Sequence, residues 1–263
     1  MMYEIQTYLG ADGLMHCTVC KEPVEAFYPK GSLLEMRKHH RQCACERKAY
    51  AEEAQYYKEK EHRELIARNK KICFEEKEME GFTFQNVERD SGVIRIAEEY
   101  VTNWQKMKQN HMGYLFWGPV GTGKSYLAAC IANALLEKEV TVKMTNFNTI
   151  LNDLFAAEDK TEYIRLLNGY ELLIIDDLGV ERSSEYALEN IFSVIDWRYR
   201  SGKPLIITTN IPLVQLKQET KIEKKRIYDR ILERCIPVKI DGVSRREAMA
   251  NDNMQTMKNI LKI

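Results

Sequence analysis

The chain has 263 residues, of which 39 are basic and 39 acidic, so its formal net charge at pH 7 is zero. This length accommodates one or two domains with a sizeable core. A composition that is 44% hydrophobic and 30% charged excludes collagen-like, low-complexity and wholly disordered chains. The balanced charge also removes any argument for nucleic-acid binding from overall basicity, so a DNA contact would have to be local.

The cysteines and the N-terminus indicate the compartment. No apolar run approaches the roughly 20 residues that a membrane span requires. Residues 1–10 lack a basic segment followed by an apolar one. Seven cysteines are an odd number for a disulfide framework, and their grouping favours a metal site or free thiols. We therefore expect a cytoplasmic protein without a membrane partner.

Four of the cysteines form two close pairs near the N-terminus. Each pair can place two sulfur atoms about 2.3 Å from one Zn²⁺, and four thiolates close a structural site with no open position for catalysis. Two alternatives stay open: the thiols carry no metal, or His39 or His40 replaces one sulfur, since the second pair is less regular. The spacing predicts a zinc site with the ligands Cys17, Cys20, Cys43 and Cys45.

A charged segment without proline or glycine follows at residues 46–80. Tyr50, Ala54 and Tyr57 recur at helical spacing, which predicts a long exposed helix ending before Gly81. Acidic side chains balance the basic ones, which favours ion pairs along the helix over a nucleic-acid surface. We expect a zinc-binding domain at 1–50 and a charged helical linker at 51–80. The linker either only connects or acts as an arm that docks a partner.

Residues 118–125 read G-P-V-G-T-G-K-S and fit the P-loop pattern. A short apolar strand at 113–117 precedes them, and Leu127, Ile131 and Leu135 follow at helical spacing, so the strand, loop and helix that the motif requires are all present. The glycines let backbone N–H groups surround phosphate oxygens at a helix N-terminus. Lys124 would reach the β- and γ-phosphates, and Ser125 would hold Mg²⁺.

A second strand at 140–144 and a helix at 146–155 lead to the apolar run 172–175, a buried strand that ends in Asp176 and Asp177. This is typical of a Walker B element. Asp176 would complete the Mg²⁺ shell, and Asp177 would polarise a water for attack on the γ-phosphate. The alternative is an acidic turn after a core strand.

A helix at 183–200 precedes another apolar strand at 204–209 with Asn210 at its tip. We expect Asn210 to lie beside the two carboxylates, where an amide can orient the attacking water. The alternative is an ordinary strand-ending Asn in a turn before Pro212.

Arginines recur four residues apart at Arg226, Arg230 and Arg234, on one face of a helix. An arginine that has no partner in the P-loop of its own chain is suited to act as an arginine finger, which contacts the γ-phosphate bound to a neighbouring chain. The alternative is a solvated basic helix. A last strand is predicted at 238–240, and Arg246 after it is a second arginine candidate.

The order of these motifs resembles the DnaC-type helicase loaders of the AAA+ superfamily, which are related to the initiator DnaA and to the transposition helper IstB. The resemblance covers residues 82 to about 246, and the cysteine-rich front resembles the zinc-binding domain of DnaI-like loaders. It implies an α/β fold: an AAA+ P-loop αβα sandwich with a five-stranded parallel sheet, preceded by the zinc domain and the charged helix.

The resemblance also assigns roles. It makes Asn210 sensor 1, Arg230 the arginine finger and Arg246 sensor 2. Most AAA+ proteins carry Glu where Asp177 stands, although Asp there is familiar among loader-like proteins, so we expect slow, partner-stimulated hydrolysis. We expect the ATPase domain at 81–263 to lack a full helical lid. The nucleotide-binding set is Gly118, Pro119, Val120, Gly121, Thr122, Gly123, Lys124, Ser125, Tyr126, Asp176 and Arg246.

The leading expectation is therefore an ATPase that uses ATP, Mg²⁺ and Zn²⁺ and loads a DnaB-type hexameric helicase onto single-stranded DNA. It would self-associate through its ATP site. Two alternatives are an IstB-like transposition helper and a non-hydrolysing zinc and nucleotide adaptor. A small-molecule P-loop kinase is disfavoured because no acceptor-binding lid is evident between the motifs. No aromatic-basic motif in the sequence marks where DNA would bind.

Overall fold

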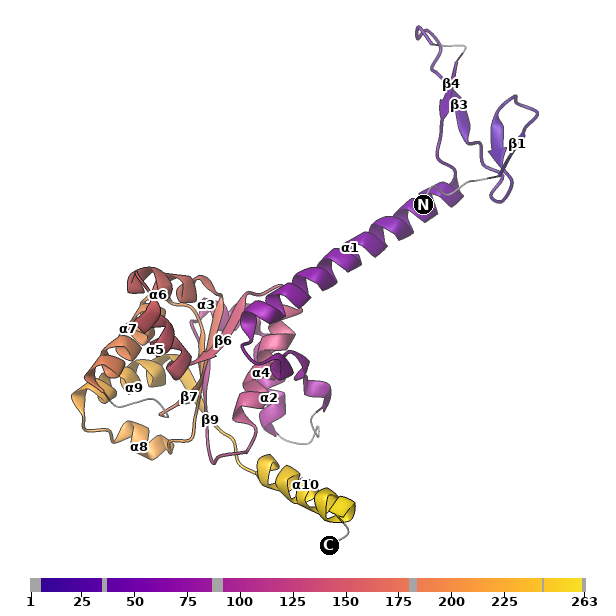
Figure 1. The fold of residues 1–263 in the computed structure, drawn as a ribbon. Helices are drawn as coiled ribbons and strands as arrows, with labels where there is room; N and C mark the ends of the chain where they lie inside the picture. Colours follow the sequence, from indigo (N-terminus) through magenta and orange to yellow (C-terminus); the bar gives the residue numbers. More distant parts are fainter. Residues whose placement is uncertain (1–5, 35–36, 87–91, 180–183, 243, 262–263) are drawn as a thin grey trace. The chain divides into compact units, whose positions relative to one another are not determined.

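The computed structural model describes residues 6–34, 37–86, 92–179, 184–242 and 244–261 (Figure 1). The chain folds into two compact units, Met1–Leu65 and Ile66–Ile263. Among the described residues, no helix combines the length and the apolar character needed to cross a bilayer.

The first unit is built from two antiparallel hairpins and the start of a helix. Strand β1 (Thr7–Leu9) pairs with β2 (Met15–Cys17), and β3 (Glu25–Phe27) pairs with β4 (Lys38–His40). Among the residues described in this unit, the buried apolar ones are Cys17, Val24 and Cys43, a very small core. So little buried apolar surface favours a fold held by a metal.

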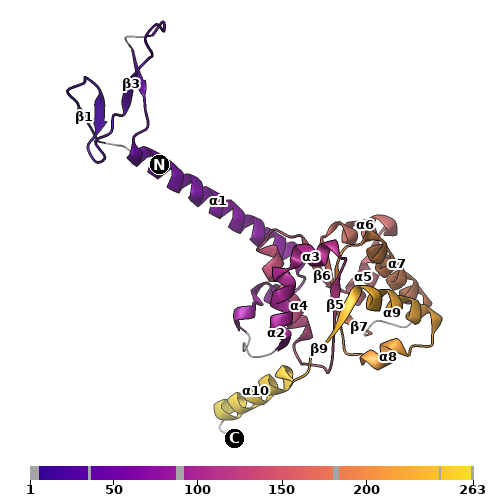
Figure 2. The same ribbon diagram turned by 180° about the vertical axis from the view of Figure 1, so that it is seen from behind.

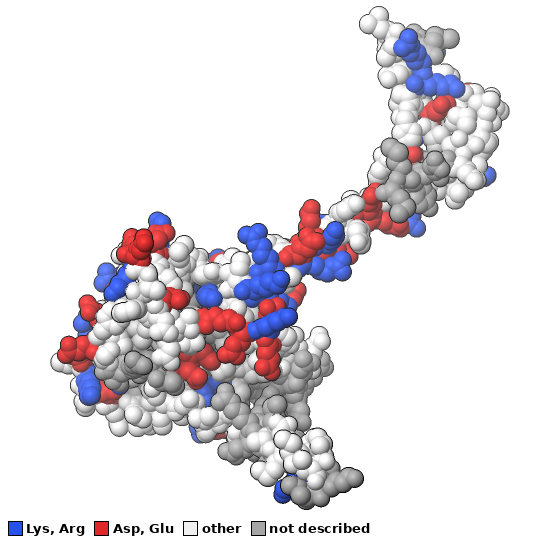
Figure 3. Space-filling model, in the orientation of Figure 1, with Lys and Arg blue, Asp and Glu red and all other residues white. Residues whose placement is uncertain are grey.

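Helix α1 (Ala44–Cys73) is exposed over most of its length, and its buried residues are Ile66 and Cys73. Basic and acidic side chains alternate along it (Figure 3), as in the pair Lys48–Glu52. The long exposed helix is confirmed, but it ends at Cys73 and not near residue 80. Beyond Cys73 the chain packs within the second unit, where Glu75 accepts hydrogen bonds from Thr145 and Thr149. Two short 3₁₀ turns follow, η1 (Lys77–Gly81) and η2 (Phe84–Asn86).

The second unit contains a five-stranded parallel sheet in the order β6-β7-β8-β5-β9. The strands are near-continuous apolar runs, as expected for a sheet covered on both faces. The parallel five-stranded sheet is confirmed, although the last strand begins earlier than predicted. The strands are β5 (Gly113–Trp117), β6 (Val142–Asn146), β7 (Leu172–Leu178), β8 (Leu205–Thr209) and β9 (Cys235–Lys239).

Helices cover both faces of the sheet, which completes the predicted αβα sandwich (Figures 1 and 2). One layer holds α2 (Gly92–Thr102), α3 (Trp104–Gln109) and α4 (Lys124–Leu136). The opposite layer holds α5 (Phe147–Ala156), α6 (Lys160–Gly169), α7 (Glu185–Ser201), α8 (Leu213–Lys217) and α9 (Ile222–Arg234). A single helix, α10 (Arg245–Leu261), follows the last strand.

Candidate functional site

The P-loop connects β5 to α4 and lies tightly against the chain that follows β9. Gly118 has φ +149°, and a Cβ there would come within 2.2 Å of the Ile240 carbonyl oxygen. Gly121 has φ +81°, and a Cβ there would come within 2.2 Å of Ser244 Oγ. A side chain at Gly118 would clash with the Ile240 backbone, and Gly121 has a left-handed φ that other residues rarely adopt, so glycine suits both positions.

Lys124 is the first residue of α4, and its side chain is buried within the loop. Its Nζ donates to the carbonyl oxygens of Gly118 and Pro119 over 3.1 and 2.7 Å. Thr122 Oγ1 also donates to the Pro119 carbonyl, over 2.9 Å. The loop thus holds its ammonium at the positive end of a helix, where phosphate oxygens bind.

Asp176 on β7 lies next to the start of α4. The Ser125 hydroxyl and the Lys124 charge both lie close enough to act on its carboxylate. Burial raises the pKa of Asp176, and the hydrogen bonds from Thr208 and Ser125 act against this rise. A hydroxyl and a carboxylate near one another are a pair of oxygen ligands that suits Mg²⁺.

Asp177 has φ +57°, an unusual conformation for a residue other than glycine. It lies within β7 rather than after it, because the strand runs on to Leu178 through a bulge. The bulge places Asp177 against Thr208 of β8, whose Oγ1 accepts a hydrogen bond of 2.9 Å from the Asp177 N–H. Sequence reasoning did not single out Thr208. Its signal was the polar side chain that directly follows the apolar run 205–207 in the predicted strand 204–209.

Asn210 follows β8 directly and is half-buried at the edge of the sheet where β7 ends. The preceding residue, Thr209, donates to the Leu178 carbonyl over 2.7 Å and so ties the two strand ends together. The position fits the expected role beside the carboxylates, which stays a prediction.

Arg230 lies on α9 with its guanidinium against α7. Its Nε donates to Oδ1 of Asp196 over 2.7 Å, and the guanidinium lies 4.6 Å from the ring centroid of Phe192. Arg226 lies over the same ring at 4.1 Å. The predicted finger is therefore paired with a carboxylate of its own chain. Arg246 is the second residue of α10, and its side chain lies outside the described part of the structure.

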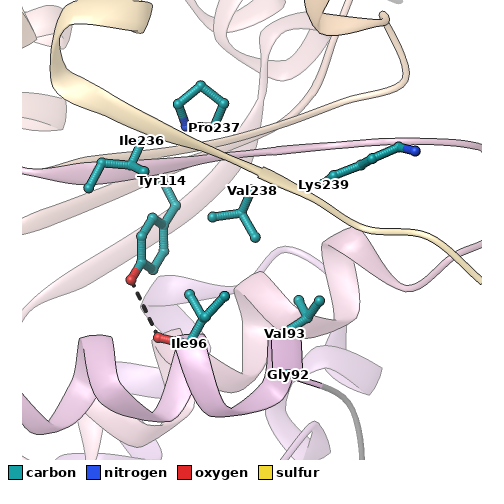
Figure 4. Close-up of a pocket in the computed structure, with 8 residues that line it drawn as sticks. All are labelled: Gly92, Val93, Ile96, Tyr114, Ile236, Pro237, Val238 and Lys239. Atoms are coloured by element: carbon teal, nitrogen blue, oxygen red, sulfur yellow. Dashed lines mark hydrogen bonds between the residues drawn. The ribbon is translucent and has the colours of Figure 1, made fainter.

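A groove of about 600 Å³ runs between α2 and the edge strand β9 (Figure 4). Tyr114 and Val238 point from the sheet toward Val93 and Ile96 of α2. Lys239, at one end of the groove, pairs in register with Trp117, the residue just before the P-loop. One end of this apolar groove thus lies level with the loop.

In the first unit the four predicted cysteine ligands come together. Their sulfur atoms all lie within 4.8 Å of one another. His39 and His40 lie on β4, where His40 pairs with Glu46, and neither belongs to the described cluster. The cluster is formed by Cys17, Cys20, Cys43 and Cys45.

The electrostatics of the cysteine cluster suit a bound cation. Backbone amides of Glu22 and Cys45 donate to the Cys20 sulfur and lower the pKa of Cys20 to about 6. Burial and the neighbouring cysteine sulfurs raise the pKa of Cys45 to about 12. One cysteine loses its proton readily, whereas others resist deprotonation, because several negative charges would then lie close together. A divalent cation bound among the sulfurs removes this resistance.

Sequence comparison relates the chain to helicase loaders. It is 24% identical over 192 residues to the replicative helicase loader DnaI of Bacillus subtilis, covering 67% of this chain and 62% of that protein. It is 29% identical over 149 residues to the replicative helicase loader DnaC of Escherichia coli K12, covering 55% and 58%. The chain spans less than two thirds of the length of these relatives.

Solved structures and a family model agree with this relationship. A crystal structure of DnaI matches with a TM-score of 0.58 at 25% identity, covering 68% of this chain and 99% of that one. The family model for IstB-like ATP binding proteins matches residues 49–252, most of the chain. The resemblance expected from the motifs is confirmed, and the chain belongs to the family of IstB-like ATP binding proteins.

Proposed function

We propose that this chain is an ATP-hydrolysing loader that places a replicative hexameric helicase on single-stranded DNA. The observation that carries the proposal is that Ser125 and the buried ammonium of Lys124 lie beside Asp176, which brings the P-loop to the Walker B strand. The similarity to two proteins named as replicative helicase loaders supports the choice of partner.

In the proposed reaction, Lys124 exchanges its two loop carbonyls for oxygens of the β- and γ-phosphates. Ser125 and Asp176 would hold Mg²⁺, which would neutralise charge on those phosphates. Asp177 accepts the proton of the attacking water, and Asn210 orients that water. The nucleotide base fits the end of the α2–β9 groove near Lys239, because this apolar surface begins level with the P-loop.

The finger role of Arg230 requires a second copy of the chain. Its guanidinium would leave Asp196 and stabilise charge that develops on a neighbour's γ-phosphate. Hydrolysis would then depend on self-association through the ATP site, and a slow rate in the isolated chain is expected.

Single-stranded DNA fits a hollow between α5 and the start of α7. Phe155 is 82% exposed and Tyr186 40% exposed, and the Lys160 ammonium lies 4.6 Å from the Tyr186 ring centroid. The amide side chains of Asn148 and Asn152 line the same hollow, whose volume is about 600 Å³. Aromatic faces next to a cation and amides are the elements with which proteins bind unpaired bases.

The first unit and the charged helix α1 are proposed to dock on the helicase, with Zn²⁺ held by the four cysteines. This division assigns recruitment to residues 1–80 and ATP hydrolysis to residues 81–263. The cysteine cluster favours a loader over a transposition helper, because the cysteine-rich N-terminal segment resembles the zinc-binding domain of DnaI-like loaders.

Purification from the native cell with identification of the bound protein tests the function. Recovery of a hexameric helicase, followed by ATP-dependent transfer of that helicase to circular single-stranded DNA, is the expected result. Recovery of a transposase instead would favour the transposition helper. ATP binding without hydrolysis, with or without the helicase, would favour the adaptor.

A further inference from the structure

Thr208 lies at the one place where the pairing of β7 and β8 changes register. Ile175 pairs with Ile207, and the next pair is Leu178 with Thr209. Two residues of β7, the Walker B carboxylates, therefore stand opposite the single residue Thr208. An irregularity of this kind re-aims side chains beside a functional site.

The hydroxyl of Thr208 contacts both bulged residues. The Asp177 N–H can only donate, so Thr208 Oγ1 accepts this bond at 2.9 Å. The hydroxyl proton is then directed to Oδ1 of Asp176, and the two oxygens lie close together. The fully buried Thr208 hydroxyl has one donor and two acceptor positions, so it can make both of these hydrogen bonds at once.

We propose that Thr208 is the positioning residue that holds the two Walker B carboxylates in the arrangement that binds Mg²⁺ with ATP. The inference rests on the proposed ATPase function and concerns the same site. By donating to Oδ1, Thr208 orients the Asp176 carboxylate toward Ser125. By accepting from its N–H, Thr208 supports the left-handed backbone of Asp177, which a regular strand would not adopt.

Thr209 supplies a matched control. It too is fully buried, and its hydroxyl likewise joins two backbone groups, donating to the Leu178 carbonyl over 2.7 Å and accepting from the Ile211 N–H over 3.1 Å. Neither of these hydrogen bonds involves a carboxylate. A loss of stability alone should therefore affect Thr208→Val and Thr209→Val alike.

The test compares ATP affinity with Mg²⁺ and with a chelator, in the full chain. In wild type and Thr209→Val, Mg²⁺ should strengthen ATP binding. In Thr208→Val the factor by which Mg²⁺ strengthens ATP binding should fall by about tenfold, because the variant loses a hydrogen bond to a charged group. ATP affinity in chelator should change less than about twofold, since the P-loop is intact. Thr208→Ser keeps the hydroxyl and should restore the gain.

Three results would each overturn the inference. Mg²⁺ could strengthen ATP binding as much in Thr208→Val as in wild type, or Thr209→Val could lose as much of this effect as Thr208→Val does. The third is that Thr208→Ser fails to restore the effect of Mg²⁺ on ATP binding. Should Thr208→Val not fold, Thr208→Ala is measured in its place, and loss of folding in both would assign Thr208 a structural role instead. A wild-type chain that binds ATP without any Mg²⁺ gain also overturns it. A wild-type chain that binds no ATP refutes the proposed function itself, so the two failures are distinct.

Discussion

Arg230 Nε donates a 2.7 Å hydrogen bond to Oδ1 of Asp196, a carboxylate that is almost fully buried on α7. Arg200 donates to the other oxygen of Asp196 over 2.8 Å from an exposed position. A finger that engages a neighbouring chain must give up the first of these bonds, which leaves Asp196 with the weaker, solvent-exposed partner. Replacing Arg230 therefore has a structural effect that an experiment must separate from a catalytic one.

Arg230→Ala should lower the free energy of unfolding by about 1–2 kcal/mol, because Asp196 loses one of its two partners. ATP affinity of the isolated chain should stay within about twofold, whereas hydrolysis should fall by about a hundredfold or more, since the guanidinium acts on charge that develops in the transition state. Arg230→Lys is the matched control for charge: it should recover much of the stability but little of the hydrolysis.

Mixing variants decides whether the finger acts between chains. Chains with Arg230→Ala keep an intact P-loop, and chains with Lys124→Ala keep an intact arginine. Mixed interfaces should regain part of the ATPase activity, measured with helicase or single-stranded DNA present so that the chains associate. Loss without recovery would indicate a finger acting within one chain. Wild-type activity in Arg230→Ala would redirect the search to Arg226 or Arg234.

Lys124→Ala should abolish measurable ATP affinity and leave the melting temperature near that of wild type. The side chain bonds to loop carbonyls of Gly118 and Pro119 and makes no contribution to the apolar core. Titration with a fluorescent ATP analogue measures the affinity. A folded variant that binds as wild type does would remove the P-loop assignment.

The motifs predicted the sheet, the helix layers and the family because each P-loop element requires its strand and helix in order. The bulge was not predictable, since nothing in the run 172–178 distinguishes a regular strand from one in which Asp177 adopts φ +57°. For the same reason Thr208 was missed. The partner of Arg230 was equally hidden, because Asp196 lies 34 residues earlier and only the packing of α7 on α9 joins them.

A zinc-selective chelator, with Mg²⁺ kept in excess, should unfold the first unit and leave ATP binding intact, because the three buried apolar residues among those described there cannot hold this unit without a metal. Elemental analysis should give one Zn²⁺ per chain. All three tryptophans, Trp104, Trp117 and Trp197, lie in the second unit, so their fluorescence reports that unit alone. Chelator should leave it unchanged while protease begins to cleave the first unit.

Cys43→Ser should reproduce the effect of the chelator, since it removes one buried sulfur from the cluster. Val19→Ala, an exposed position between two of the ligands, is the matched control and should retain zinc. A purified chain with zinc near zero that nevertheless resists protease in its first unit would contradict the metal assignment.

Phe155→Ala should weaken binding of a fluorescent single-stranded oligonucleotide by about tenfold, because stacking of a base on an aromatic ring contributes about 1–3 kcal/mol. Tyr186→Ala should act in the same direction and also release the Lys160 ammonium that lies over its ring. The hollow joins α5 to the start of α7, so DNA bound there would contact the helix that follows β6 and the one that follows the Walker B strand.

Leu166→Ala, which changes an exposed apolar residue on α6 outside the hollow, is the control and should bind DNA as wild type does. ATP affinity should be unchanged in all three variants, since none of these side chains touches the P-loop. Equal DNA binding by Phe155→Ala and Leu166→Ala, measured at one fixed salt concentration, would remove this hollow from the DNA-binding surface.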